Sequence, residues 1–160
     1  MPNLPAGGLR WLAGVFVLLL SATTVGAASA DGDPVYGANP VNMWGPPSDP
    51  EWAANDPTLH ADSLRGTALC ISAGTGMPGP HESMSDRDVA GNPVALADHV
   101  VIGGGFESVV NGCTARLAAA LGAAGVPARI DFRPTGTHAW GYRQDALHDS
   151  WPMFAAAIGA

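Results

Sequence analysis

Two short apolar runs, separated by one long amphipathic stretch, constrain the fold of this chain more than any other feature. The first run, residues 67–76 (TALCISAGTG), ends in glycines and predicts a buried strand that leads into a loop. The second run, residues 127–134 (PARIDFRP), predicts another strand. Between them, apolar residues recur at helical spacing over 106–124, and Gly125 follows as a C-cap. A strand, a helix and a strand in this order call for parallel pairing with a right-handed crossover, which is an α/β fold.

Two Asp-Pro pairs before the first run indicate short helices. In each pair an N-cap residue precedes a proline that suits the first helical position. Helices are therefore expected over 50–55 (PEWAAN) and over 57–66 (PTLHADSLRG), the second ending at Gly66. Residues 31–48 are rich in Gly, Pro, Asn and Asp and predict a loop.

Two further segments complete the chain. Residues 77–104 contain several prolines and run into the glycine triplet 103–105, so they predict a long irregular stretch. Residues 144–159 (QDALHDSWPMFAAAIG) predict a terminal helix that Pro152 either kinks or restarts.

The first thirty residues read as a secretory signal peptide. Arg10 provides a positive start, residues 11–20 (WLAGVFVLLL) form an unbroken apolar core, and small residues favour cleavage after Ala30. A core of about ten residues is too short to span roughly 30 Å of hydrocarbon, so a cleaved signal is favoured over a retained anchor. The expected organisation is a signal at 1–30 followed by one exported domain at 31–160.

Composition excludes several classes of partner. The formal net charge of −7 argues against a nucleic-acid partner, and no segment is basic enough to bind anionic lipid. No metal-binding motif is present, so neither a metal nor a cofactor is predicted. The candidate metal ligands are scattered without such spacing: His60, His81, Glu82, His99 and His148. The histidines among them are expected to be solvated surface groups.

His138 follows the second predicted strand. Ligands collect at the carboxyl ends of strands in open α/β sheets, so a histidine placed there suits a general base. The alternative is a loop histidine that hydrogen-bonds the backbone.

Glu107 lies at the start of the long predicted helix, before His138 in the chain. It suits the role of a carboxylate that orients the imidazole, since α/β-hydrolases place Ser, then Asp or Glu, then His in this order. The alternative is an acid that only complements the helix dipole, worth about 0.3–1 kcal/mol.

A nucleophile is not evident. No serine has the G-x-S-x-G frame, Ser72 would be buried in mid-strand, and neither Ser83 nor Ser85 follows a strand. Cys113 lies on the apolar face of the helix and is expected to be core. Free buried thiols at Cys70 and Cys113 are favoured over a disulfide, because strand and helix layers lie about 10 Å apart.

Four segments resemble one family. They are 43–57 (MWGPPSDPEWAANDP), 72–82 (SAGTGMPGPHE), 104–110 (GGFESVV) and 132–147 (FRPTGTHAWGYRQDAL). In this order they resemble the C-terminal part of the antigen 85 mycolyltransferases, which are secreted α/β-hydrolase-fold esterases of mycobacteria and their relatives.

By this resemblance, His138 falls on the catalytic histidine and Glu107 on the catalytic glutamate. The resemblance also implies a set of residues that line the trehalose and acyl site: Val109, Val110, Asn111, Gly112, Arg116, Ala139 and Trp140. Asn111 and Gly112 depart from the basic and hydroxyl residues that the family uses there. Trp140 either stacks on a sugar face or is a core aromatic.

The family moves a mycoloyl group from one trehalose monomycolate to another, or to arabinogalactan, through a serine. The resemblance thus implies a secreted acyltransferase or carboxylic-ester hydrolase of the cell envelope that acts on acylated trehalose. The family's serine elbow and oxyanion donors belong to its N-terminal half. We therefore expect an incomplete α/β-hydrolase, the C-terminal strand-helix-strand-helix part of a three-layer sandwich, inactive without a complementing nucleophile half. The alternative is an inactive secreted fragment or an acyl-sugar binding remnant.

Overall fold

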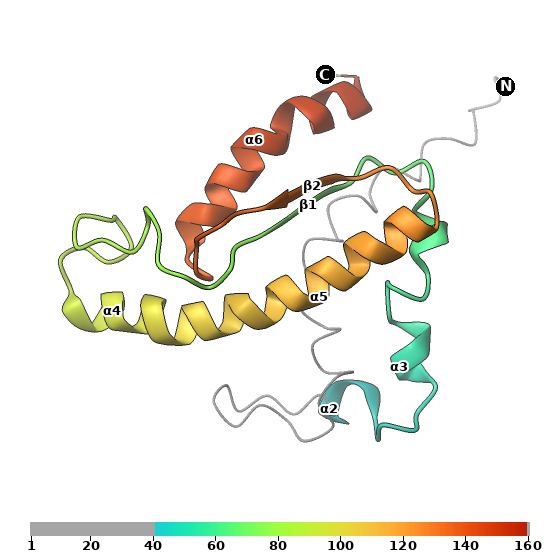
Figure 1. Cartoon of the computed structure of the whole chain (residues 1–160), viewed down its shortest axis with the longest axis horizontal. Helices are drawn as coiled ribbons and strands as arrows, with labels where there is room; N and C mark the ends of the chain where they lie inside the picture. Colours follow the sequence, from blue (N-terminus) through green and yellow to red (C-terminus); the bar gives the residue numbers. More distant parts are fainter. Residues whose placement is uncertain (1–40, 160) are drawn as a thin grey trace, which may run out of the picture.

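A computed structural model describes residues 41–159 (Figure 1). The signal segment predicted at 1–30 and the first part of the loop predicted at 31–48 lie outside the described residues. Within the described part, residues 41–66 precede a strand-helix-strand unit, and a terminal helix follows it.

Two parallel strands form the centre of the structure. β1 (Cys70–Ala73) pairs with β2 (Arg129–Phe132) in a register that sets Cys70 opposite Arg129 and Ala73 opposite Phe132. The connection runs through the helix α5 (Gly104–Ala123). The predicted α/β unit with parallel pairing is confirmed.

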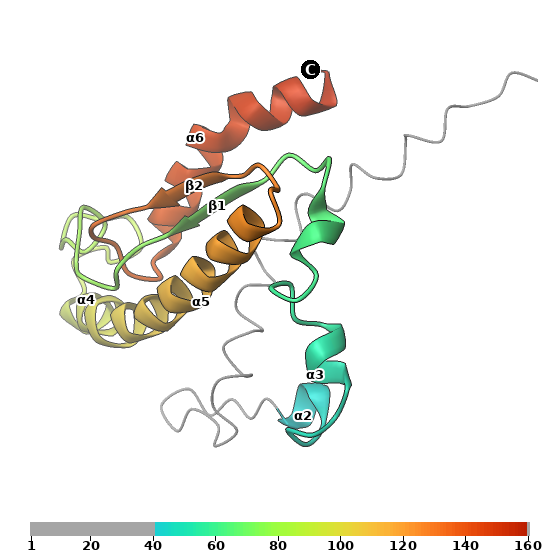
Figure 2. The same cartoon turned by 45° about the vertical axis from the view of Figure 1, so that its right-hand side comes forward.

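The two long helices cover opposite sides of this small sheet. α5 lies on one side and α6 (Trp140–Ile158) on the other, as both views show (Figures 1 and 2). β1 is buried along its whole length, whereas Ile130 and Phe132 of β2 are partly exposed. Helices on both faces of the sheet account for the burial of all four residues of β1.

The core lies between β1 and α5. Its central cluster contains six buried residues: Ala61, Leu69, Ile71, Leu117, Leu121 and Val126. Cys113 and Cys70 are also buried, and both are free thiols, as predicted. Burial raises the pKa of the Cys70 thiol, which makes it a poor nucleophile.

The prediction of an irregular stretch over 77–104 is wrong in its second part. α4 (Pro93–Asp98) and a π-helical turn, η4 (His99–Gly103), lead directly into α5. Asn92 is the N-cap, and its Oδ1 accepts the N–H of Val94 at 2.9 Å. The glycine triplet concealed this helix, because glycine disfavours helix by about 1 kcal/mol per residue.

The continuous helix Pro93–Ala123 is the one described helix long and apolar enough to cross a membrane by length and composition alone. Its later part packs on β1, with Leu117 in the same core cluster as Ile71, and it carries the fully buried carboxylate of Glu107. One face of α5 therefore lies in the core, whereas α4 and η4 contain no fully buried residue. At its C-terminus Gly125 adopts φ +63°, and Arg65 donates to the carbonyls of Ala124 and Gly125.

The segment before β1 is less helical than predicted. α2 (Val41–Trp44) forms within the expected loop, and α3 (Glu51–Ala54) forms where a helix was expected. The helix predicted over 57–66 is reduced to a 3₁₀ turn, η3 (Ala61–Leu64). Asp56 makes the capping contact expected of it, because its Oδ1 accepts the N–H of Thr58 at 2.8 Å, but only turns follow it up to η3.

The terminal helix is longer than predicted. α6 begins at Trp140, four residues before the expected start, and continues through Pro152. Proline cannot donate to the carbonyl one turn earlier. Side chains bind neighbouring carbonyls at this point: Ser150 Oγ donates to Ala146 O at 2.7 Å, and Arg129 Nη1 donates to Asp149 O at 2.6 Å.

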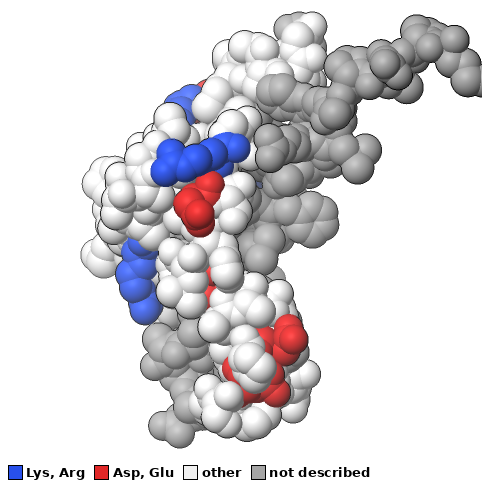
Figure 3. Space-filling model, turned by 90° about the vertical axis from the view of Figure 1, so that its right-hand side faces the viewer, with Lys and Arg blue, Asp and Glu red and all other residues white. Residues whose placement is uncertain are grey.

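Charged side chains are sparse on the surface. On the face shown in Figure 3 they form separate small groups, and most of that surface is uncharged. The expectation that nucleic acid is not the partner rests on the net charge of −7 and stays a prediction.

Candidate active site

Three segments of the chain are joined by backbone hydrogen bonds at the carboxyl ends of the strands, and we call this region the crossing. The N–H of Gly76 donates to Gly136 O at 2.9 Å, and the N–H of Gly136 donates to Met77 O at 2.7 Å. The N–H of His138 donates to Gly103 O at 3.1 Å, just before α5. The crossing therefore joins the loop after β1, the loop after β2 and the start of α5.

Glycine is required where these backbones approach each other. Gly76 has φ +87°, and a Cβ there would lie 2.3 Å from Gly104 O. A Cβ on Gly74 would lie 2.4 Å from Gly136 O. Since real Cβ atoms do not come this close to a carbonyl, the glycines allow the approach that brings Glu107 and His138 together.

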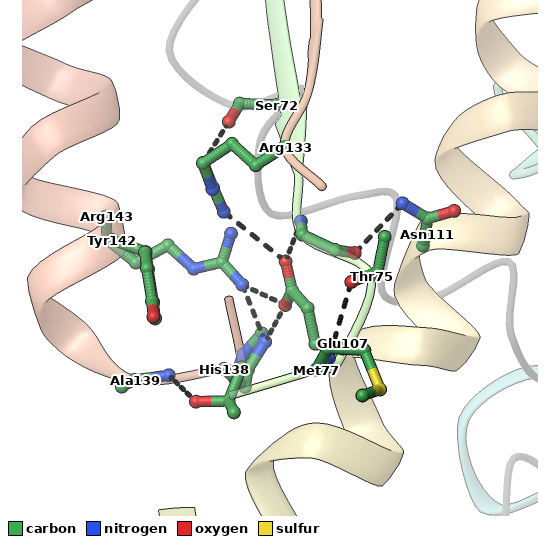
Figure 4. Close-up of polar contacts among 12 residues, drawn as sticks. Ser72, Thr75, Met77, Glu107, Asn111, Arg133, His138, Ala139, Tyr142 and Arg143 are labelled. Carbon is green, nitrogen blue, oxygen red and sulfur yellow. Dashed lines mark hydrogen bonds and ion pairs between the residues drawn. The ribbon is translucent and has the colours of Figure 1, made fainter. Parts of the chain in front are cut away.

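Glu107 is the centre of the site and is fully buried (Figure 4). Its Oε1 accepts the N–H of Gly74 at 2.7 Å, and its Oε2 lies 2.7 Å from Nδ1 of His138. The carboxylate thus links the end of β1 to the histidine that follows β2. This is the contact that the order of the two residues in the chain led us to expect.

Two arginines share the same carboxylate. Arg143 Nη2 donates to Oε2 of Glu107 at 2.5 Å, and Arg133 Nη2 lies 3.6 Å from Oε1. Both arginine side chains are 18% exposed. Arg133 also donates from Nη1 to Ser72 Oγ at 2.5 Å and lies with its guanidinium carbon 5.2 Å from the centre of the Tyr142 ring.

These neighbours keep the Glu107 carboxylate ionised. Burial raises the pKa of this carboxyl, but the hydrogen bond with His138, the N–H of Gly74 and the charge of Arg143 together lower it further. The net result is a pKa below the ordinary value of 4.5. A charged carboxylate can stabilise a protonated imidazole beside it.

The His138 ring is 40% exposed, in contrast to its carboxylate partner. The ring of Phe106 packs edge-on against it, with the centroids 4.4 Å apart. Among the described residues, no hydrogen bond reaches its Nε2. This nitrogen can accept a proton from an incoming hydroxyl when the ring proton is on Nδ1.

The residues predicted to line a substrate site are spread along α5 and the start of α6. Only Asn111 and Ala139 contact the crossing: Asn111 Nδ2 donates to Gly74 O at 2.9 Å, and the N–H of Ala139 donates to Thr137 Oγ1 at 3.3 Å. Val110 is buried in the core and Val109 is exposed.

Among residues 41–159, the remaining predicted positions make no hydrogen bond to the crossing. A Cβ on Gly112 would meet no atom within 4 Å, and Arg116 Nη2 contacts the sulfur of Cys113. Trp140 is 64% exposed, so its interpretation as a core aromatic is wrong. Its position beside Ala139 leaves the sugar-stacking role as a prediction.

No hydroxyl among residues 41–159 is hydrogen-bonded to His138. Ser72 is buried and accepts a hydrogen bond from Arg133. The Oγ atoms of Ser83 and Ser85 lie 3.2 Å apart, exposed on the loop after β1. The described residues therefore place an imidazole and a carboxylate together and leave the nucleophile unassigned.

Sequence reasoning missed a second polar cluster that anchors the loop after β1. Glu82 Oε2 accepts the N–H of Gly79 at 2.7 Å and the hydroxyl of Tyr142 at 2.6 Å, while Oε1 accepts the hydroxyl of Thr137 at 2.6 Å. Burial and the neighbouring Glu82 raise the pKa of Tyr142, so its hydroxyl stays a donor. Glu82 therefore anchors the loop after β1 to the loop after β2 and to α6.

His81 joins this cluster and is not a free surface histidine. Nδ1 lies 3.0 Å from Asp86 Oδ2 and Nε2 lies 2.7 Å from Asp145 Oδ2, so the loop is bound to α6. With both nitrogens engaged by carboxylates, the ring has no free site for acid-base work. No group of metal-ligating side chains occurs in the part of the chain that the structure describes.

The ion pairs of His81 predict a pH-dependent stability. The hydrogen bond to Asp145 raises the pKa of His81, burial opposes it, and Asp86 adds to the increase, leaving the pKa above 6.5. This stabilisation is complete below about pH 6.5 and is lost as the pH rises through the raised pKa.

Urea unfolding at a series of pH values should show this loss in the parent chain and not in His81→Gln. The variant His60→Gln should retain it, and an unchanged pH dependence in His81→Gln would disprove the assignment.

Comparison with known proteins identifies the relationship. No protein-family model matches this chain. The diacylglycerol acyltransferase/mycolyltransferase Ag85B of Mycobacterium avium is 33% identical over 122 residues, which cover 74% of this chain. The corresponding Ag85A of Mycobacterium leprae is 27% identical over 157 residues, and that of Mycobacterium tuberculosis is 28% identical over 144 residues, each covering 88% of this chain. The chain is a relative of the antigen 85 mycolyltransferases.

The relationship concerns the C-terminal part of antigen 85. The match covers 32% of the length of the Mycobacterium avium protein, 38% of that of Mycobacterium leprae and 37% of that of Mycobacterium tuberculosis. This chain thus spans about a third of the length of the curated relatives it matches. The resemblance inferred from the four sequence segments is confirmed.

Proposed function

We propose that Glu107 and His138 form the acid-base part of a serine acyl-transfer site on a partial α/β-hydrolase fold. Nε2 of His138 is the general base that takes a proton from a serine hydroxyl and later returns it to the leaving group. Glu107 orients the ring through Nδ1 and stabilises its protonated form. The observation that carries this proposal is the 2.7 Å contact between Nδ1 and the fully buried carboxylate.

The serine comes from outside the 160-residue chain in this proposal. A catalytic pair without its nucleophile retains only the residual rate from binding and oxyanion donors, several powers of ten below the complete site. The 160-residue chain alone is therefore expected to hydrolyse p-nitrophenyl esters at close to the uncatalysed rate. Turnover that disappears in Ser83→Ala or Ser85→Ala would assign the nucleophile to this loop instead.

The proposed substrate is an acylated trehalose or a similar glycolipid, handled outside the cell after export by the segment at 1–30. The names of the relatives, diacylglycerol acyltransferase/mycolyltransferase, support an acyl donor with long apolar chains. Trp140, exposed and two residues after His138, suits stacking on a sugar ring. The proposal requires neither a metal nor a cofactor.

A chimera tests the proposal directly. In Mycobacterium avium Ag85B, the C-terminal part is replaced by residues 41–160 of this chain, and acyl transfer to trehalose is measured. We expect activity that disappears with His138→Gln and persists with His148→Gln, a change of an exposed histidine on α6. Folded chimeras that are equally active with and without His138, or that lack activity altogether, would contradict the proposed role.

A second candidate is a secreted binding protein for acylated sugars. It is favoured by one observation, the lack of a hydroxyl bonded to His138 among the described residues beside an exposed Trp140. Titration of the full chain with a trehalose monoester, followed by tryptophan fluorescence, should then show saturable binding that Trp140→Ala weakens. Saturable binding together with an inactive folded chimera would favour this candidate over the acyl-transfer site.

A further inference from the structure

Three polar atoms at the candidate active site lie mutually within hydrogen-bond distance (Figure 4). Arg143 Nη2 lies 2.5 Å from Glu107 Oε2 and 2.6 Å from His138 Nδ1, and Nδ1 lies 2.7 Å from the same oxygen. The guanidinium keeps its protons at every pH of interest. A neutral imidazole carries one proton, on Nδ1 or on Nε2, so the triangle admits two different proton arrangements.

The first arrangement places the ring proton on Nδ1. This N–H donates to Oε2 of Glu107, which also accepts from Arg143. Two protonated nitrogens, Nδ1 and Nη2, then face each other at 2.6 Å with no acceptor between them. The contact is shorter than an ordinary N–H to N hydrogen bond and is repulsive when both nitrogens carry protons.

The second arrangement places the ring proton on Nε2. The lone pair of Nδ1 then accepts from Nη2 of Arg143, which satisfies the 2.6 Å contact, and Nδ1 and Oε2 of Glu107 become two acceptors 2.7 Å apart with no proton between them. Glu107 does not need the ring proton in this arrangement, because it accepts the N–H of Gly74 at 2.7 Å and the N–H of Arg143, with Arg133 at 3.6 Å as a further positive charge. The ring is 40% exposed, so an N–H on Nε2 can donate to water.

The position of Arg143 is set by the fold. The residue lies in the first turn of α6, and its side chain is 18% exposed. The preceding residue, Tyr142, is buried and donates to Glu82 on the loop after β1. The start of α6 is therefore held at two points: Tyr142 binds Glu82 on the loop after β1, and Arg143 binds Glu107 on α5.

We propose that Arg143 is a positioning residue that opposes Glu107 and holds neutral His138 with its proton on Nε2. In this state Nε2 cannot accept a proton from a hydroxyl. When the guanidinium leaves Nδ1, the ring proton moves through water from Nε2 to Nδ1, Glu107 accepts it in a hydrogen bond, and Nε2 becomes a base. The consequence for catalysis rests on the proposed function, whereas the proton position is a property of this chain alone.

The proton position is measurable without any activity. The full chain is labelled with ¹⁵N, and the two ring nitrogens of His138 are observed by long-range ¹H–¹⁵N correlation at about pH 8.5, roughly two units above the ordinary histidine pKa. We expect an unprotonated Nδ1 and a protonated Nε2. In Arg143→Gln the two nitrogens should exchange these states. Arg133→Gln is the matched control, because Arg133 contacts the same carboxylate but not the ring, and it should match the parent chain.

Three results would overturn the proposal: a protonated Nδ1 in the parent chain, an unchanged ring in a folded Arg143→Gln, or the same exchange of states in both variants. The first needs no substitution, so the test survives a variant that does not fold. Arg143→Met, which keeps the length of the side chain without its donors, is the second variant. The proposed function is tested separately, since the chimera reports on His138 and the ring spectrum reports on Arg143.

Discussion

Replacing Glu107 by glutamine is expected to lower the free energy of unfolding by about 3–5 kcal/mol. The carboxylate is fully buried and is the shared anionic partner of two arginine side chains that are themselves mostly buried. Glutamine keeps the volume of the side chain, so a packing defect would not be the cause. Its amide supplies one acceptor oxygen and places an N–H group against either Gly74 or Arg143, both of which are donors. A buried charge without its partner costs more than the lost hydrogen bond alone.

Urea unfolding at pH 7 measures this loss, with Glu51→Gln as the control. Glu51 is an exposed carboxylate on α3, and its replacement should change the free energy of unfolding by less than about 0.5 kcal/mol. Equal free energies of unfolding for the two variants would mean that Glu107 does not stabilise the buried charges of Arg133 and Arg143.

Replacing Gly76 by alanine is expected to cost about 2–5 kcal/mol. The left-handed conformation, φ +87°, accounts for about 1–2 kcal/mol when a Cβ is present. The remainder comes from the Cβ itself, which would lie 2.3 Å from the carbonyl oxygen of Gly104 and force the loop away from α5. Overpacking of this kind costs about 1–3 kcal/mol. The same displacement would move Gly74 and its hydrogen bond to Glu107.

Gly91→Ala is the matched control for this change. Gly91 has φ +77°, but a Cβ there would meet no atom within 4 Å, so only the cost of the left-handed conformation, about 1–2 kcal/mol, is expected. Thermal or urea unfolding of both variants isolates the contribution of the crossing. A loss for Gly76→Ala no larger than that for Gly91→Ala would show that the close approach to Gly104 is not required.

The parallel strand-helix-strand unit could be predicted because its signals are local and periodic. Ile71 and Leu117 follow the patterns of a buried strand and of an apolar helix face, and both lie in the core. The helix over 93–103 could not be predicted, because the glycines at 103–105 read as a loop. Their use becomes clear only when Gly104 meets Gly76 across the crossing. Tertiary contact has overridden propensity at this point.

The pairing of Glu107 with His138 could also be anticipated, since the order of an acid and a histidine at strand ends is a property of the chain. The arginines could not. Arg143 follows His138 by five residues across the start of α6, and Arg133 reaches Glu107 from the end of β2. No periodic or spacing signal marks either contact. The clusters around Glu82 and His81 were missed for the same reason, because their partners lie on α6 and in the preceding loop, more than fifty residues away.

The central claim is that the Glu107 carboxylate and the His138 ring act as one unit, and the titration of Glu107 tests it most directly. The ¹³C signal of its carboxyl group reports the pKa in the folded chain. In the acidic range the histidine ring carries protons on both nitrogens, so Nδ1 donates to the carboxylate. We predict a pKa below the ordinary 4.5 in the parent chain and a higher value in His138→Ala. A Glu107 pKa at or above 4.5 that does not respond to His138→Ala would contradict the account.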